Sequence, residues 1–117
     1  MAKIKAFTDL DQSKKLAEIL PNESADMCWV TGEIEPLWGV IKSEPDDDFD
    51  VIPSWSLAAL LEVLPEGAIM PYYVPCLQKE DGKYSVAYGD DELLCEANNP
   101  IDACVEMILK LHEEKLI

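Results

Sequence analysis

The chain has 117 residues and a formal net charge of −15, with 24 aspartate and glutamate residues against nine basic residues, all of them lysine. Its apolar content of 49% excludes a disordered acidic tail, and its length suits one hydrophobic core. The lack of arginine and the presence of only one histidine, His112, remove the side chains that most often clamp phosphates or transfer protons near neutral pH. We therefore expect a single domain over residues 1–117, and we favour a non-enzymatic function over catalysis.

The first residues lead into an amphipathic segment and contain no continuous apolar stretch of the kind that a signal peptide or a membrane span needs. The longest apolar block, residues 55–64, is ten residues long and includes Ser56 and Glu62. We therefore expect a cytoplasmic protein that does not associate with a membrane.

A helix is predicted over residues 9–20. Asp9 is the N-cap, Gln12 completes a capping box, and Pro21 lies beyond the end. Residues 27–30 and 37–41, rich in aromatic and β-branched side chains, are predicted to be two neighbouring strands.

An acidic loop is predicted over residues 44–50, and a second helix is predicted from Pro53 and Ser54 to Pro65. Because residues 55–64 are apolar on almost every face, this helix is expected to be central and the most buried element of the fold.

A β-hairpin is predicted from residues 70–79 and 83–89, because Asp81-Gly82 is a signal for a two-residue type I′ turn. The turn places Glu80 opposite Lys83, and the same register pairs Leu77 with Val86 and Pro75 with Tyr88. Pro71 and Pro75 suit an edge strand, where their missing N–H groups need no partner. A homo-oligomer formed through this edge strand is a further expectation.

Residues 93–95 suggest a short strand, and Asn99 is predicted to cap the last helix, with Pro100 at its first position. Its inward stripe includes Cys104, Ile108 and His112, and Asp102, Glu106, Lys110 and Glu113 lie on the opposite face. The expected fold is α+β, with about three helices packed on an antiparallel sheet of four to five strands.

Motifs for common chemistry are missing from the chain: it has no phosphate-binding loop, dinucleotide fingerprint, nucleophile elbow or zinc-protease motif. The four cysteines lack metal-ligand spacing, so buried thiols are favoured over a metal site or a disulfide. Asp46, Asp48 and Asp50 imitate the start of a calcium loop, but Val51 and Leu57 stand where glycine and glutamate are needed. We therefore expect no cofactor, no metal site and no catalytic residue.

Acidic charge is concentrated in residues 43–53 and 80–99, each with a net charge of −5. Such stretches either keep the protein soluble or form a surface that attracts a basic protein. Direct binding of nucleic acid is not expected, because no basic residues lie among the aromatic ones. The candidate interaction surface consists of Asp46, Asp47, Asp48, Asp50, Asp90, Asp91 and Glu92.

The segments Pro53-Ser54-Trp55-Ser56-Leu57-Ala58-Ala59-Leu60-Leu61-Glu62-Val63-Leu64-Pro65 and Asn99-Pro100-Ile101-Asp102-Ala103-Cys104-Val105-Glu106-Met107-Ile108 resemble small uncharacterised proteins of gut Bacteroidales and their prophages. The similarity covers roughly residues 53–117. It implies an α+β fold and a phage or mobile-element setting, and it transfers no catalytic residue.

These observations predict a non-enzymatic protein-binding or regulatory domain that acts on a basic protein, in an anti-defence or immunity-like role. The alternative is a small enzyme or ligand-binding domain that uses a cysteine, His112 or the loop from Asp46 to Asp50.

Overall fold

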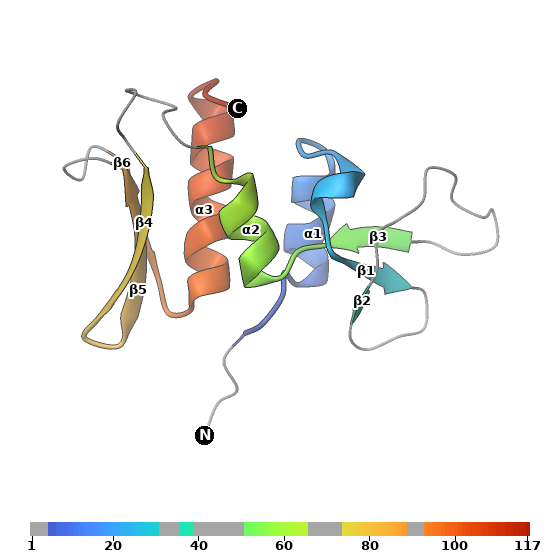
Figure 1. Ribbon diagram of the computed structural model, residues 1–117, viewed down its shortest axis with the longest axis horizontal. Helices are drawn as coiled ribbons and strands as arrows, with labels where there is room; N and C mark the ends of the chain where they lie inside the picture. Colours follow the sequence, from blue (N-terminus) through green and yellow to red (C-terminus); the bar gives the residue numbers. More distant parts are fainter. Residues whose placement is uncertain (1–4, 31–35, 39–50, 66–73, 89–92) are drawn as a thin grey trace.

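The computed structural model describes residues 5–30, 36–38, 51–65, 74–88 and 93–117, which form three α-helices, one 3-10 helix and six strands (Figure 1). In chain order the elements are α1 (Leu10–Ala17), η1 (Asn22–Ser24), β1 (Met27–Val30), β2 (Leu37–Trp38), β3 (Val51–Ser54), α2 (Leu57–Val63), β4 (Pro75–Glu80), β5 (Lys83–Tyr88), β6 (Leu93–Ala97) and α3 (Pro100–Glu113).

The strands form two antiparallel sheets of three strands each, in the orders β2-β1-β3 and β4-β5-β6. The sheets lie at opposite ends of the molecule, with the helices between them (Figure 1). The predicted α+β class and its three helices are confirmed. One sheet was expected, but the described strands divide into two because α2 and α3 lie between β3 and the β4-β5-β6 sheet.

The start of α1 follows the prediction. The Asp9 carboxylate accepts a hydrogen bond from the backbone N–H of Gln12 at 2.8 Å, and the Gln12 side chain accepts one from the Asp9 N–H at 3.1 Å. The helix ends at Ala17, earlier than the predicted Leu20. The backbone N–H groups of Glu18 and Ile19 bond back three positions instead of four, as the tightened last turn of a helix often does, and the Leu20 N–H still reaches the Leu16 carbonyl four positions back.

The predicted start of the second helix is wrong, because Pro53 and Ser54 belong to β3 and α2 begins after the N-cap Ser56. Proline is compatible with this position since β3 is an edge strand. Burial also differs from the prediction: α2 buries Ala59 and Leu60, while Leu61 remains 38% exposed.

Helix α3 is the most buried of the three described helices. It lies between the β4-β5-β6 sheet on one side and α2 and α1 on the other, so most of its circumference is covered (Figure 1). Its buried residues are Pro100, Ile101, Ala103, Cys104, Val105, Met107, Ile108 and Leu111. The predicted Asn99 cap and first-turn Pro100 are confirmed, whereas His112, predicted on the inward stripe, is exposed.

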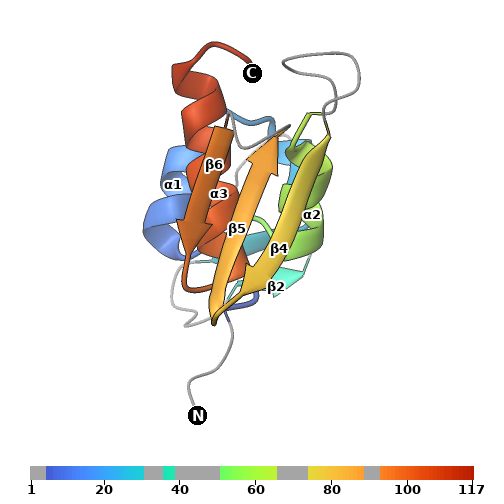
Figure 2. The same ribbon diagram turned by 90° about the vertical axis from the view of Figure 1, so that its left-hand side faces the viewer.

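The predicted hairpin is confirmed over β4 and β5 with its register: Glu80 pairs with Lys83, Leu77 with Val86, and Pro75 with Tyr88. The rest of the predicted hairpin, residues 70–73 with Pro71 and residue 89, lies outside the described residues. Asp81 and Gly82 have φ values of +52° and +77°, as a type I′ turn requires. β4 is an edge strand, as predicted, and β6 is the other edge (Figure 2). None of the helices in the described ranges is long and apolar enough to cross a membrane.

Candidate functional site: a groove beside β6

A groove of about 430 Å³ lies where α1, the end of β6 and the first half of α3 meet. Its lining is mostly polar and comes from segments that are far apart in the chain. The lining residues are Gln12, Lys83, Glu96, Ala97, Asn98, Asp102 and Glu106.

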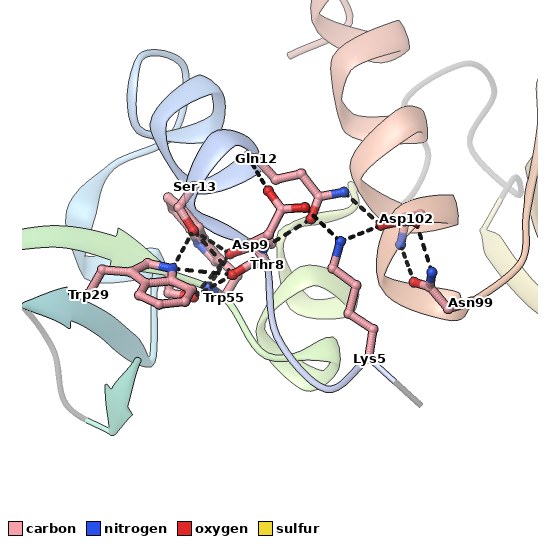
Figure 3. A network of polar contacts seen from close by, with 10 residues as sticks. Lys5, Thr8, Asp9, Gln12, Ser13, Trp29, Trp55, Asn99 and Asp102 are labelled. Carbon is pink, nitrogen blue, oxygen red and sulfur yellow. Dashed lines mark hydrogen bonds and ion pairs between the residues drawn. The ribbon is translucent and has the colours of Figure 1, made fainter. Parts of the chain in front are cut away.

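The inner wall of the groove is held in place by Asp102, whose carboxylate joins three segments of the chain (Figure 3). One oxygen, Oδ1, accepts hydrogen bonds from Lys5 Nζ and from Gln12 Nε2, both at 2.7 Å. The other oxygen accepts a hydrogen bond from the Asn99 side chain at 2.8 Å. Asp102 thereby links the N-terminal segment and α1 to the start of α3.

Lys5 bridges Asp102 and Asp9, which lies 2.9 Å from the Lys5 ammonium. Partial burial acts to lower the pKa of Lys5, but its hydrogen bonds with Asp102 and Asp9 outweigh that effect and raise the pKa above the ordinary 10.5. Burial acts to raise the pKa of Asp102, and the bonds from Lys5, Gln12 and Asn99 reverse this and lower it. The charge of Asp102 is therefore already compensated within the protein.

Glu96 and Glu106 are exposed and form no hydrogen bond or ion pair with another described residue. Lys83 brings one ammonium group to the same lining. With Asp102 compensated by Lys5, the free carboxylates of the groove are those of Glu96 and Glu106. Carboxylates of this kind accept hydrogen bonds from ammonium and guanidinium groups.

The residues predicted as the interaction surface lie outside the described residues. Asp46, Asp47, Asp48 and Asp50 fall in residues 39–50, and Asp90, Asp91 and Glu92 fall in residues 89–92. Glu96 belongs to the same acidic stretch as the second group, residues 80–99, and is described on β6.

A second polar cluster is buried beneath α1 and joins it to β3 (Figure 3). The Thr8 hydroxyl bonds to the Ser13 hydroxyl at 2.7 Å and to the Ser54 hydroxyl at 3.1 Å. Trp29 donates its indole N–H to Ser13, and the Trp55 backbone N–H donates to Thr8. Among the described residues no histidine, lysine or carboxylate bonds to these hydroxyls, so the cluster holds elements together and activates no nucleophile.

The cysteines differ in access: Cys76 is exposed, Cys28 is half-buried, and Cys95 and Cys104 are buried. Burial raises the pKa of the Cys104 thiol to about 11 and also raises that of Cys95. Because the thiolate is the nucleophile, both buried thiols are inert near neutral pH. Within the described ranges, no group of three or more histidine, cysteine, aspartate and glutamate residues could hold a metal ion.

No family model matches the chain, and neither a curated protein nor a solved structure matches it.

The sequence does not predict the groove, because Gln12 and Asp102 are 90 positions apart in the chain. The only visible signal is the spacing of Asp102 and Glu106, which places both on one face of α3.

Proposed function

We propose that this chain is a non-enzymatic binding or regulatory protein that docks on a basic surface of another protein. The observation that carries the proposal is the groove beside β6, where the carboxylates of Glu96 and Glu106 bond to no other described residue and stand on a framework fixed by Asp102. A charged group held on a rigid element gives electrostatic attraction with a defined geometry, which favours one partner over others.

The predicted acidic residues extend this proposal. Asp46, Asp47, Asp48, Asp50, Asp90, Asp91 and Glu92 belong to the two stretches that carry two-thirds of the net charge. We assign them to long-range attraction of the partner, which raises the association rate and is screened by salt. The proposed setting is the cytoplasm, in an anti-defence or immunity-like role linked to a phage or mobile element.

The binding role is favoured over the enzymatic alternative by the chemistry of the described candidates. The Cys95 and Cys104 thiols are buried with raised pKa values, and His112 is exposed at the end of α3. Neither arrangement provides a nucleophile with a base in hydrogen-bonding reach.

The experiment begins by capturing a protein on the immobilised chain from a lysate of the source cells. The captured partner is then identified and purified. Its affinity is measured for the original chain and for two double variants of the chain, which change the net charge by the same amount. One variant carries Glu96→Gln and Glu106→Gln in the groove, and the other carries Glu113→Gln and Glu114→Gln at the exposed end of α3.

We expect the groove variant to bind about tenfold more weakly and the control variant to stay within about twofold of the original chain, because a contacted charge matters more than a distant screened one. Equal effects of the two variants, or a partner whose binding is independent of salt, would contradict the proposal.

A further inference from the structure

Among the described strands, none pairs with the edge of β6 that faces away from β5. In a hairpin with a two-residue turn, Glu80 and Lys83 exchange both backbone hydrogen bonds, and this fixes which residues of β5 bond to β4. The alternate residues of β5 then bond to Leu93, Cys95 and Ala97 of β6. The N–H and C=O groups of Leu94 and Glu96 therefore point outward, and no described strand pairs with them.

The two edges of this sheet differ in how well they are protected against the addition of another strand. On β4 the outward positions include Pro75, which has no N–H group, and Lys79, and both residue types block the addition of another strand. The sequence of β6, Leu-Leu-Cys-Glu-Ala, contains neither proline nor lysine. Its free edge also adjoins the groove, since Glu96 and Ala97 are among the lining residues.

Charge identifies what can pair with this edge. The Glu96 side chain lies on the outer face of the sheet, in the same row as Ser85 and Gln78. Glu106 lies on α3, which packs behind the inner face: burial raises the pKa of Cys95 on that face, Lys110 of α3 acts to lower it, and Glu106 acts to raise it. A strand added to β6 would thus meet one free carboxylate on each face.

We propose that β6 binds an extended basic segment of the partner protein, which adds to the sheet as a fourth strand. In antiparallel register, one lysine of the segment lies opposite Glu96 and the next basic residue faces the groove and Glu106. The following residue is apolar and packs beside Leu94, which is 43% exposed. This inference rests on the proposed function, because it assigns the basic partner a segment and a place.

The test uses a defined probe, the blocked peptide acetyl-Ser-Thr-Lys-Lys-Val-Thr-Ser-amide, titrated into the full chain with calorimetric or NMR detection. The comparison peptide is N-methylated at the first lysine and at the valine, the two residues whose N–H groups would bond to β6. Both peptides have the same charge. We expect N-methylation to weaken binding by about tenfold or more, because two backbone hydrogen bonds are lost.

A matched pair of variants tests the same point on the protein. Leu94→Pro removes an outward N–H from β6, and Lys79→Pro removes one from β4, so each leaves the internal ladder of the sheet intact. Leu94→Pro should abolish the preference for the unmethylated peptide, and Lys79→Pro should preserve it. Circular dichroism and the melting temperature check that both variants fold.

The outcomes separate this inference from the proposed function. If both peptides bind equally and the binding still falls with Glu96→Gln and Glu106→Gln, the groove recognises basic groups but strand addition is wrong. If neither peptide binds while the purified partner does, strand addition is also overturned. Loss of preference with Leu94→Pro alone supports it.

Discussion

At the scale of single residues, the Asp102 side chain has two roles, one at the start of α3 and one between distant segments. Its carboxylate accepts a hydrogen bond from the side chain of Asn99, the N-cap of α3, and it also accepts bonds from Lys5 and Gln12, which lie 97 and 90 positions earlier in the chain. A residue predicted only to lie on the outward face of the last helix is also a tertiary link. Patterns along a chain indicate caps well, because the partners are three residues apart, and they carry no information on distant partners.

The pH dependence of stability should reveal this link. The pKa values of Asp102 and Asp9 are lowered from 3.8 in the folded protein. The two carboxylates therefore contribute fully to the free energy of unfolding above pH 3.8, and this contribution is lost as the pH falls through their folded pKa values. The raised pKa of Lys5 acts at the opposite end, where its contribution is lost as the pH rises above 10.5.

We expect the free energy of unfolding, measured by urea denaturation, to fall as the pH drops below about 4, and to fall less in Asp102→Asn. At pH 7 that variant should be less stable by about 1–3 kcal/mol, because a charged partner of Lys5 is lost. Glu106→Gln is the control and should change stability by under about 0.5 kcal/mol. Parallel pH profiles for the original chain and Asp102→Asn would show that the link does not contribute.

Cysteine access gives a second prediction at this scale. With a maleimide near neutral pH, Cys76 should be labelled first, and Cys95 and Cys104 only when the protein unfolds. Peptide mass spectrometry after short labelling times, with and without urea, identifies each site. Rapid labelling of Cys104 in the folded protein would contradict its burial in α3.

At the scale of elements, local signals predict α1, the β4–β5 hairpin and α3, because a cap or a turn residue marks each of them. Pro53 and Ser54 fail as signals since both residues suit a helix start and an edge strand, and only pairing with β1 decides between them. The apolar sequence of residues 55–64 predicts more burial than α2 has, for a related reason. An apolar sequence shows what a helix can bury, while its neighbours determine what it does bury.

Amide exchange tests the arrangement of the β4-β5-β6 edges. The N–H groups of Leu77 and Lys79 on β4, and of Leu94 and Glu96 on β6, should exchange fast, and their neighbours in each strand should exchange slowly. The interior of α3 from Cys104 to Leu111 should be the slowest region, and NMR-detected exchange resolves each residue. Uniform protection along β6 in the free protein would mean that its edge is already paired.

At the scale of the whole molecule, the two described sheets are held apart by the three described helices (Figure 1). The groove lies beside one sheet, where α1 reaches α3. Composition shows that the protein is acidic, and the order of the residues places two-thirds of the net charge in two stretches. The sequence does not predict which carboxylates lie beside an unpaired strand edge. The proximity of Glu96, Glu106 and the β6 edge depends on the fold.

An NMR titration tests the central claim most directly, with isotope-labelled protein and the purified basic partner, or the lysine peptide as a minimal probe. We predict that the first and largest shift changes occur at residues 93–98 and at Asp102 and Glu106, and that they shrink as salt rises from low to physiological concentration. Shift changes centred on the β1–β3 sheet, or no changes at any salt concentration, would contradict the assignment of the groove beside β6 as the binding site.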